Sequence, residues 1–135
     1  MDDMLLPEDR VAGDSARAGD CFNPNCVSRT ILTHVTGRWG SLVIAALRIC
    51  GVLRFSQLRG RIGGISEKML AQTLRDLERD GLILRTSRPV VPPYVDYRLT
   101  AMGIGVAEHV EGLVRWIEAH VRDVVFAQRE HDSET

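Results

Sequence analysis

Thiols near the N-terminal end of the chain are the first side chains in this sequence whose type and spacing suggest chemistry. Cys21 and Cys26 flank Asn23, Pro24 and Asn25, and a turn formed by those residues could bring the two sulfur atoms close together. Cys26 also lies near the start of an expected helix, whose dipole lowers the pKa of a thiol and makes it more reactive. The pattern predicts either a thiol at Cys26 that senses oxidants or electrophiles and is resolved by Cys21, or two inert thiols.

Enzymatic and metal-binding interpretations of the same residues meet geometric objections. Cys26 and His34 would lie two turns apart on one helix, about 12 Å by rise per residue, which is too far for a nucleophile and its base. A zinc site with His34 would lack one ligand, and its spacing is unlike the common zinc motifs. The chain also lacks a glycine-rich phosphate loop, an HExxH motif and a serine elbow. We therefore expect no enzymatic activity, no metal and no cofactor, and we expect Cys50, at a helix end, to be a packed small hydrophobe.

The second chemical feature is a basic face on the helix predicted from Ser66 to Asp80, which we call the reading helix. Leucines at helical spacing define its buried side: Leu70, Leu74 and Leu77. The N-terminal half of the other side is expected to face base edges in a major groove, through Ser66, Lys68, Met69, Gln72 and Thr73. Residues further along, Arg75 and Arg79, are expected to contact the sugar–phosphate backbone. The alternative is a solvated helix face, balanced by the acidic residues Glu67, Asp76, Glu78 and Asp80.

The elements around the reading helix form a recognisable order. Three helices are predicted before it, at Ser28–Val35, Trp39–Ile49 and Ser56–Arg61, with a very short strand at Arg54-Phe55 and a turn at Gly63-Gly64. Ser56 is expected to cap the third of these helices, and Ser66 to cap the reading helix, whose first turn holds the acidic Glu67. Two strands are predicted after it, at Leu82–Thr86 and Tyr94–Leu99, and a stiff loop with three prolines joins them. In the second strand apolar residues alternate with Asp96 and Arg98, which fits a half-buried edge whose polar residues face solvent. Thr100 is expected to cap a long final helix.

This order predicts an α+β, mostly α fold: a winged helix-turn-helix domain with a two-stranded wing and a long C-terminal dimerisation helix. We expect a flexible acidic arm at 1–20, the domain at 21–127 with its wing at about 82–99 and its dimer helix at about 101–127, and a tail at 128–135. Arg85 and Arg88 of the wing are expected to contact DNA. The apolar stripe of the final helix is expected to pair with a second copy, through Val106, Val110, Leu113, Trp116, Ile117 and Val121.

The charge of the chain is unevenly distributed. The 135 residues carry a net charge of -1, but residues 21–100 hold twelve basic and five acidic side chains, a balance of +7, between two acidic ends of -4 each. This basic block coincides with the helix-turn-helix pattern and suits a phosphate backbone. No apolar run approaches the ~18 residues that a membrane span needs, and the acidic start is unlike a signal peptide. The sequence therefore predicts a cytoplasmic protein of one domain, with no membrane partner.

Four stretches carry a resemblance to a known family: Gly37-Arg38-Trp39, FSQLRGRIGGIS from Phe55 to Ser66, LRDLERDGL from Leu74 to Leu82, and VDYRLTAMG from Val95 to Gly103. Over roughly residues 26–120 the chain resembles the HxlR-type winged helix-turn-helix regulators, relatives of the MarR group. The resemblance implies a homodimer on a near-palindromic operator, acting as a repressor or activator whose DNA affinity responds to electrophiles or oxidants. In many relatives a cysteine lies thirteen residues before the tryptophan of the first motif, and Cys26 holds that position. The chain departs from the relatives at Val27, where they usually have proline, and at Arg38, where they usually have lysine.

The sequence thus predicts a homodimeric DNA-binding regulator, a repressor, whose partners are duplex operator DNA, a second copy, and a small electrophile or oxidant acting at Cys26. Two alternatives stay open. One is a regulator that responds to a small-molecule ligand and has inert cysteines. The other is a winged-helix module that binds proteins instead of DNA. An acidic exposed face on the reading helix would indicate such a module.

Overall fold

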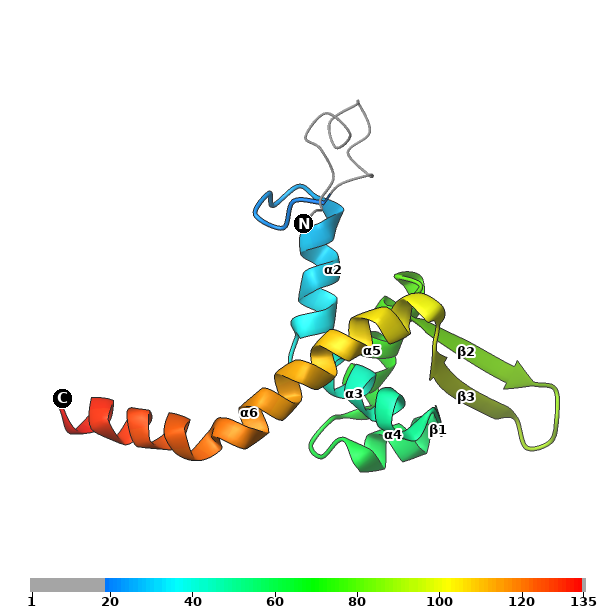
Figure 1. Ribbon diagram of the computed structural model, residues 1–135. Helices are drawn as coiled ribbons and strands as arrows, with labels where there is room; N and C mark the ends of the chain where they lie inside the picture. Colours follow the sequence, from blue (N-terminus) through cyan, green and yellow to red (C-terminus); the bar gives the residue numbers. More distant parts are fainter. Residues whose placement is uncertain (1–18, 135) are drawn as a thin grey trace.

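The protein is described by a computed structural model that covers residues 19–134, so the predicted acidic arm lies almost entirely outside the described residues. The elements follow in the order α2 (Val27–Thr36), α3 (Gly40–Cys50), β1 (Val52–Arg54), α4 (Phe55–Arg61), α5 (Glu67–Arg79), β2 (Ile83–Arg88), β3 (Tyr94–Leu99) and α6 (Ala101–Ser133). Figure 1 shows a central helical body from which three parts project: the hairpin of β2 and β3, the C-terminal half of α6, and α2. The predicted winged helix-turn-helix architecture is confirmed.

The core lies where α3, α4, α5, the sheet and the first turns of α6 meet. The predicted leucine face of the reading helix is confirmed, since Leu70, Leu74 and Leu77 of α5 are all buried. Leu58 of α4 and Val43 of α3 are fully buried in the same cluster. Burial of each such side chain stabilises the fold by about 1.5–3 kcal/mol, so the cluster fixes the pose of α5 against the body.

The turn between α4 and α5 is set by glycine and a hydroxyl cap. Gly64 has a φ of 88°, a left-handed conformation that glycine adopts without steric cost. The Ser66 hydroxyl accepts a hydrogen bond from the Met69 amide at 3.1 Å and caps α5 as predicted. The predicted cap at Ser56 is wrong, because α4 begins at Phe55 and the Gln57 side chain instead accepts from the amide of Arg54.

The sheet has three strands, in the order β1-β3-β2, so β3 is central and the wing hairpin gains a short third strand. Arg54 of β1 lies opposite Asp96 of β3. The sequence pattern indicated that Asp96 faces solvent on a half-buried edge, but its residue is only 1% exposed because β1 pairs on that side. One carboxylate oxygen of Asp96 makes no hydrogen bond, and its nearest basic partner is the Arg98 guanidinium at 3.8 Å.

The final helix is longer than predicted and is only partly packed on the domain. Thr100 caps α6 by accepting from the Gly103 amide at 3.0 Å, as expected, but α6 continues to Ser133, so the predicted tail at 128–135 is mostly helical. Its buried residues end at Val110. No helix within residues 19–134 is both long and apolar enough to cross a membrane.

Candidate DNA-binding surface and thiol site

The face of α5 that turns away from the core carries the predicted DNA-contacting residues. All of them are exposed except Thr73: Ser66, Lys68, Met69, Gln72, Arg75 and Arg79. Thr73 is half-buried, and its hydroxyl donates to the Met69 carbonyl oxygen at 2.8 Å, so this hydroxyl is already used within its own helix. The leucine side and the polar side of α5 thus lie opposite each other, as the helical spacing predicts.

The acidic residues at the two ends of α5, Glu67 and the C-cap Asp80, pair with other elements, which argues against a neutralised, merely solvated face. Glu67 pairs with Arg59 of α4 at 3.3 Å, and Asp80 contacts His34 of α2 at 2.6 Å. Within residues 19–134, no carboxylate lies within 4.0 Å of the cations Lys68, Arg75 and Arg79. The basic row is therefore available to phosphates.

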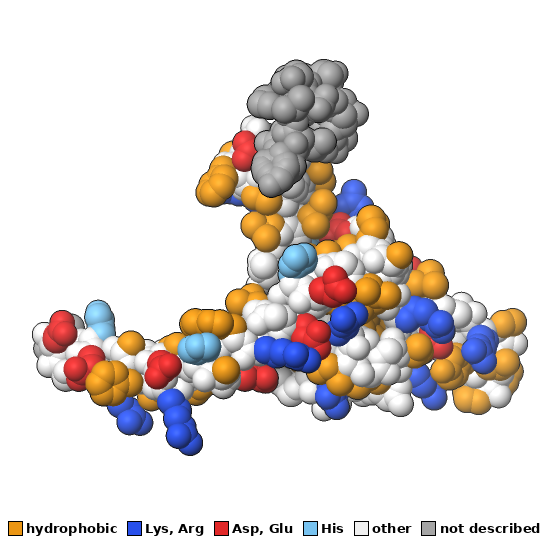
Figure 2. All heavy atoms as spheres, in the orientation of Figure 1, with side chains coloured by type: hydrophobic (Ala, Val, Ile, Leu, Met, Phe, Trp, Pro, Cys, Tyr) orange, Lys and Arg blue, Asp and Glu red, His pale blue; other side chains and the backbone are white. Residues whose placement is uncertain are grey.

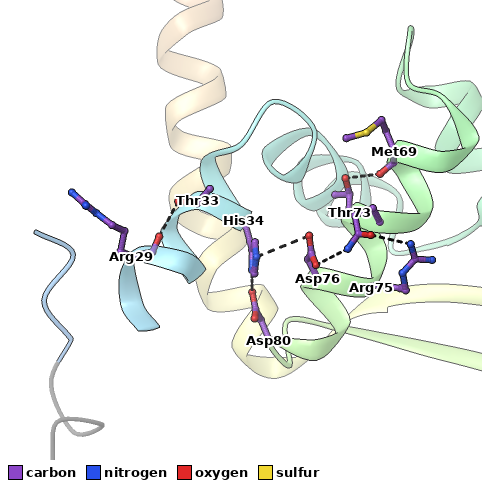
Figure 3. A network of polar contacts seen from close by, with 9 residues as sticks. Arg29, Thr33, His34, Met69, Thr73, Arg75, Asp76 and Asp80 are labelled. Carbon is purple, nitrogen blue, oxygen red and sulfur yellow. Dashed lines mark hydrogen bonds and ion pairs between the residues drawn. The ribbon is translucent and has the colours of Figure 1, made fainter. Parts of the chain in front are cut away.

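A chain of polar contacts crosses the reading helix and was not foreseen. The Gln72 amide nitrogen donates to Asp76 at 3.0 Å, and the Gln72 amide oxygen accepts from Arg75 at 3.0 Å. Asp76 in turn lies 4.0 Å from His34 (Figure 3). The contacts of Gln72 had a sequence signal, because Arg75 and Asp76 lie three and four positions further along the same helix. The contact with His34 had none, because α2 lies far away in the sequence.

A shallow cleft separates α5 from the α2–α3 connection. It has a volume of about 590 Å³ and is lined by Thr33, His34, Gly37, Arg38, Trp39, Gly40, Met69, Thr73 and Asp76. Arg38 lies over the ring of Trp39, with its guanidinium carbon 4.9 Å from the ring centre. Met69 and Thr73 therefore border this cleft as well as the reading face.

The wing brings further cations together. Arg85 faces α5 and lines a small pocket with Arg75 and Glu78. Arg88 lies on the other face of the sheet, 5.1 Å from the ring centre of Tyr94, and Arg54 lies 4.8 Å from the same ring. The sequence analysis did not identify Arg54 as a residue of this basic cluster. Its place beside the wing depends on the pairing of β1 with β3, and a strand of three residues is too short to show an alternating pattern.

The thiol of Cys26 is held by hydrogen bonds at the start of α2. Its sulfur accepts from the Ser28 hydroxyl at 3.0 Å and from the Asp20 amide at 3.4 Å. Together with the Ser28 amide, these donors hold the pKa of the Cys26 thiol below its ordinary value, against smaller opposing effects of burial and the charge of Asp20. Residue 26 is also the N-cap position of α2.

The other two cysteines differ from Cys26 in their surroundings. Cys21 is a free, exposed thiol whose sulfur contacts the Ser28 carbonyl oxygen at 3.8 Å, so Cys21 and Cys26 both touch Ser28. Cys50 is exposed, and the expectation of a packed hydrophobe is wrong there. Cys50 lies on the same side of α3 as the buried Leu47. It is exposed because it is the last residue of α3, and the buried residues of this helix end one turn earlier, at Leu47.

Two apolar surfaces on the projecting helices have no cover within residues 19–134. On α2 they are Val27, Ile31 and Leu32; on α6 they are Leu113, Trp116, Ile117, Val121, Val124 and Phe126. Figure 2 shows orange side chains along both projections. Of the predicted dimer-contact residues, Val110 is 6% exposed in the core of its own subunit and is therefore corrected to a subunit-core position, while Val106 is half-buried against the same core.

A helix-turn-helix with a wing, and with a row of unpaired cations on the exposed face of its reading helix, defines a DNA-binding transcriptional regulator, not an enzyme. Residues 34–124 match the family described as HxlR-like helix-turn-helix, and the chain belongs to that family. It is 50% identical to the HTH-type transcriptional regulator YtfH of Escherichia coli strain K12, itself uncharacterised, over 84% of this chain and 90% of that one.

Solved structures agree with this assignment. The chain is similar to ytfH from Salmonella typhimurium, described as a transcriptional regulator, with 52% identity and a TM-score of 0.78 over 84% of this chain and 99% of that one. It is also similar to the redox regulator HypR in its reduced form, with 32% identity and a TM-score of 0.66 over 75% of this chain and 98% of that one.

Proposed function

We propose that the protein is a homodimeric repressor that binds a near-palindromic operator, with α5 of each subunit in successive major grooves. The observation that carries this proposal is the polar face of α5, which is exposed and whose cations Lys68, Arg75 and Arg79 have no carboxylate within 4.0 Å among residues 19–134. A regulator of transcription acts on DNA, so the proposal also locates the protein in the cytoplasm. Gln72 would bind the edge of an adenine, and Lys68 would bind either the edge of a guanine or a phosphate.

The remaining contacts would hold the protein on the duplex. Arg75 and Arg79 would bind phosphates, Met69 would touch a thymine methyl group, and the Ser66 hydroxyl keeps its hydrogen free for a phosphate oxygen. On the wing, Arg85 would reach the backbone next to α5. Arg88 lies near the tip of the hairpin and would enter the adjacent minor groove.

A pair of substitutions separates base reading from backbone binding. Gln72→Ala should lower affinity for the operator about 5- to 150-fold, the range expected for one bidentate base contact, while binding to random duplex changes little. Arg79→Ala should weaken both kinds of binding alike. It should also reduce the slope of log affinity against log salt concentration by about one, because one phosphate contact is lost. The operator duplex is first selected from a random-sequence pool, and affinities are measured by fluorescence anisotropy at several salt concentrations. Unchanged operator preference in Gln72→Ala would mean that α5 does not read bases through this residue.

Dimerisation follows from the surfaces on α2 and α6. A single helix-turn-helix reads few base pairs, so specific affinity needs two half-sites about 34–36 Å apart. The C-terminal half of α6 has no buried residue, and a lone helix gains little stability from its own backbone bonds. The exposed apolar residues of both helices would be covered by a second copy, with Trp116 and Ile117 near the seam.

We further propose that Cys26 is the sensor of an oxidant or electrophile, with Cys21 able to resolve it. Support comes from the lowered pKa of Cys26, which raises the thiolate fraction, and from the likeness to the redox regulator HypR. Diamide or an aldehyde should release wild-type protein from its operator, and Cys26→Ser should remain bound. Cys50→Ser is the matched control, since Cys50 is exposed but its thiol has no such donors, and it should respond like wild type. Equal release of wild type and Cys26→Ser, or no release of either, would contradict the sensing role.

The cleft beside α5 favours a second candidate, a regulator that responds to a small-molecule ligand and has inert cysteines. A ligand in this cleft would touch Met69 and Thr73 on the reading helix as well as Trp39 at the start of α3. The Cys26→Ser experiment decides between the two, because a ligand-responsive regulator would not depend on that thiol.

A further inference from the structure

The side chain of His34 is the polar contact between α2 and the reading helix. Its Nδ1 atom lies 2.6 Å from the Asp80 carboxylate and its Nε2 atom 4.0 Å from the Asp76 carboxylate. Figure 3 shows His34 pointing from α2 toward these two acids, which lie one turn apart on α5. The side chains of His34 and Asp80 are only 18% and 10% exposed, so water competes little for their bond.

The contact matters because little else fixes α2 to the domain. None of the residues of α2 is buried, and its partly buried Val35 reaches the core only from the last turn. At the same end, a Cβ on Gly40 would overlap the carbonyl oxygen of His34, so α3 approaches the backbone of α2 closely there. The opposite end of α2, where Cys26 is the N-cap, projects away from the body (Figure 1).

From His34 the contacts continue to the side chain proposed to read a base. Asp76 uses Oδ2 toward His34 and Oδ1 to accept from the Gln72 amide nitrogen. The Gln72 amide oxygen accepts from Arg75. A glutamine amide offers two N–H donors and two acceptor positions, so one donor and one acceptor position remain to meet an adenine edge in a fixed orientation.

We infer that His34 is a positioning residue for DNA recognition: by holding Asp76 and Asp80, it sets the orientation of the Gln72 amide and ties it to the position of α2. This inference rests on the proposed role of α5 as the DNA-reading helix. Without the imidazole, two half-buried carboxylates on α5 lose their shared partner, and Asp76 no longer has a fixed place from which to hold Gln72. The consequence is lost discrimination between base pairs rather than lost attraction to DNA.

The test measures the ratio of affinities for the selected operator and for a random duplex, in wild type, His34→Ala, Gln72→Ala and the double variant. His34→Ala should lower this ratio about tenfold while affinity for the random duplex stays within about twofold. If His34 acts through Gln72, the double variant should be no less selective than Gln72→Ala alone, because coupled residues are not additive. His34→Gln, whose longer side chain brings an N–H donor near the Nε2 position that faces Asp76, should restore most of the ratio, and His109→Ala, an exposed histidine on α6, should leave it unchanged.

Urea unfolding midpoints identify any variant that fails to fold, and His34→Asn, which keeps a donor near the Nδ1 position for Asp80 but offers none near Asp76, then takes the place of His34→Ala. An unchanged ratio in folded His34→Ala, or an equal further loss when His34→Ala is added to Gln72→Ala, overturns the inference while the proposed function stands. If Gln72→Ala itself leaves the ratio unchanged, the base-reading role of this face fails, and the inference fails with it.

Discussion

Replacing Trp116 and Ile117 together by serine should give a folded monomer whose affinity for the operator is lower by about 10³-fold, the low end of the gap between specific and non-specific binding. These side chains are 55% and 48% exposed on the part of α6 that leaves the domain, so their loss costs the subunit core little. A partner helix, in contrast, would lose two large apolar contacts at the seam. Without a second subunit only one half-site is read at a time.

Sedimentation at micromolar concentration and anisotropy titration of the operator measure the two effects. The matched control is Met102→Ser with Ile104→Ser, since these side chains are 62% and 44% exposed on the same helix but near the domain. The control should remain a dimer and keep its affinity. A wild-type protein that sediments as a monomer, or a Trp116/Ile117 variant that still dimerises, would contradict this arrangement.

Leu70→Ala should destabilise the protein by about 2–5 kcal/mol, a large share of the 5–15 kcal/mol that stabilises a typical domain. Leu70 is fully buried at the first full turn of α5, where its side chain anchors the same segment that carries Lys68 and Gln72. Removing its methyl groups leaves a cavity that neighbouring helices cannot fill without shifting the reading helix. DNA affinity should therefore fall along with stability.

Urea unfolding at a fixed subunit concentration measures the change, because dimerisation makes stability depend on concentration. Leu84→Ala is the control: this leucine is 51% exposed on β2, and its loss should change stability by no more than about 0.5 kcal/mol. A change below about 1 kcal/mol for Leu70→Ala would show that the site collapses around the smaller side chain and that the leucine does not anchor α5.

Local patterns were enough to predict the frame of the DNA-binding domain. The buried side of α5 was read from leucines at spacings of four and three, and its cap from a hydroxyl before an acidic first turn. These features depend on residues within about one turn of each other, so a single sequence contains all the information needed. The same holds for the wing hairpin, where β-branched and aromatic residues alternate next to a proline-rich loop.

Features that depend on distant pairs were missed or misjudged. Asp96 was expected to face solvent because its own strand alternates, but the pairing of β1 with β3 makes that strand central and buries the carboxylate. Cys50 was expected to be a packed small hydrophobe at a helix end, yet it is exposed, because the buried residues of α3 end at Leu47. In both cases the neighbour that decides burial lies elsewhere in the chain.

The sequence by itself therefore determined which side chains form the reading face of α5 and which thiol begins α2, because helical periodicity and caps are local properties. Only the tertiary structure decided what those side chains contact. It brought His34 to Asp80 across 46 positions of sequence, paired Glu67 with Arg59 of α4, and left the end of α6 without a core. Such contacts arise from the packing of whole elements, which no short stretch of residues encodes.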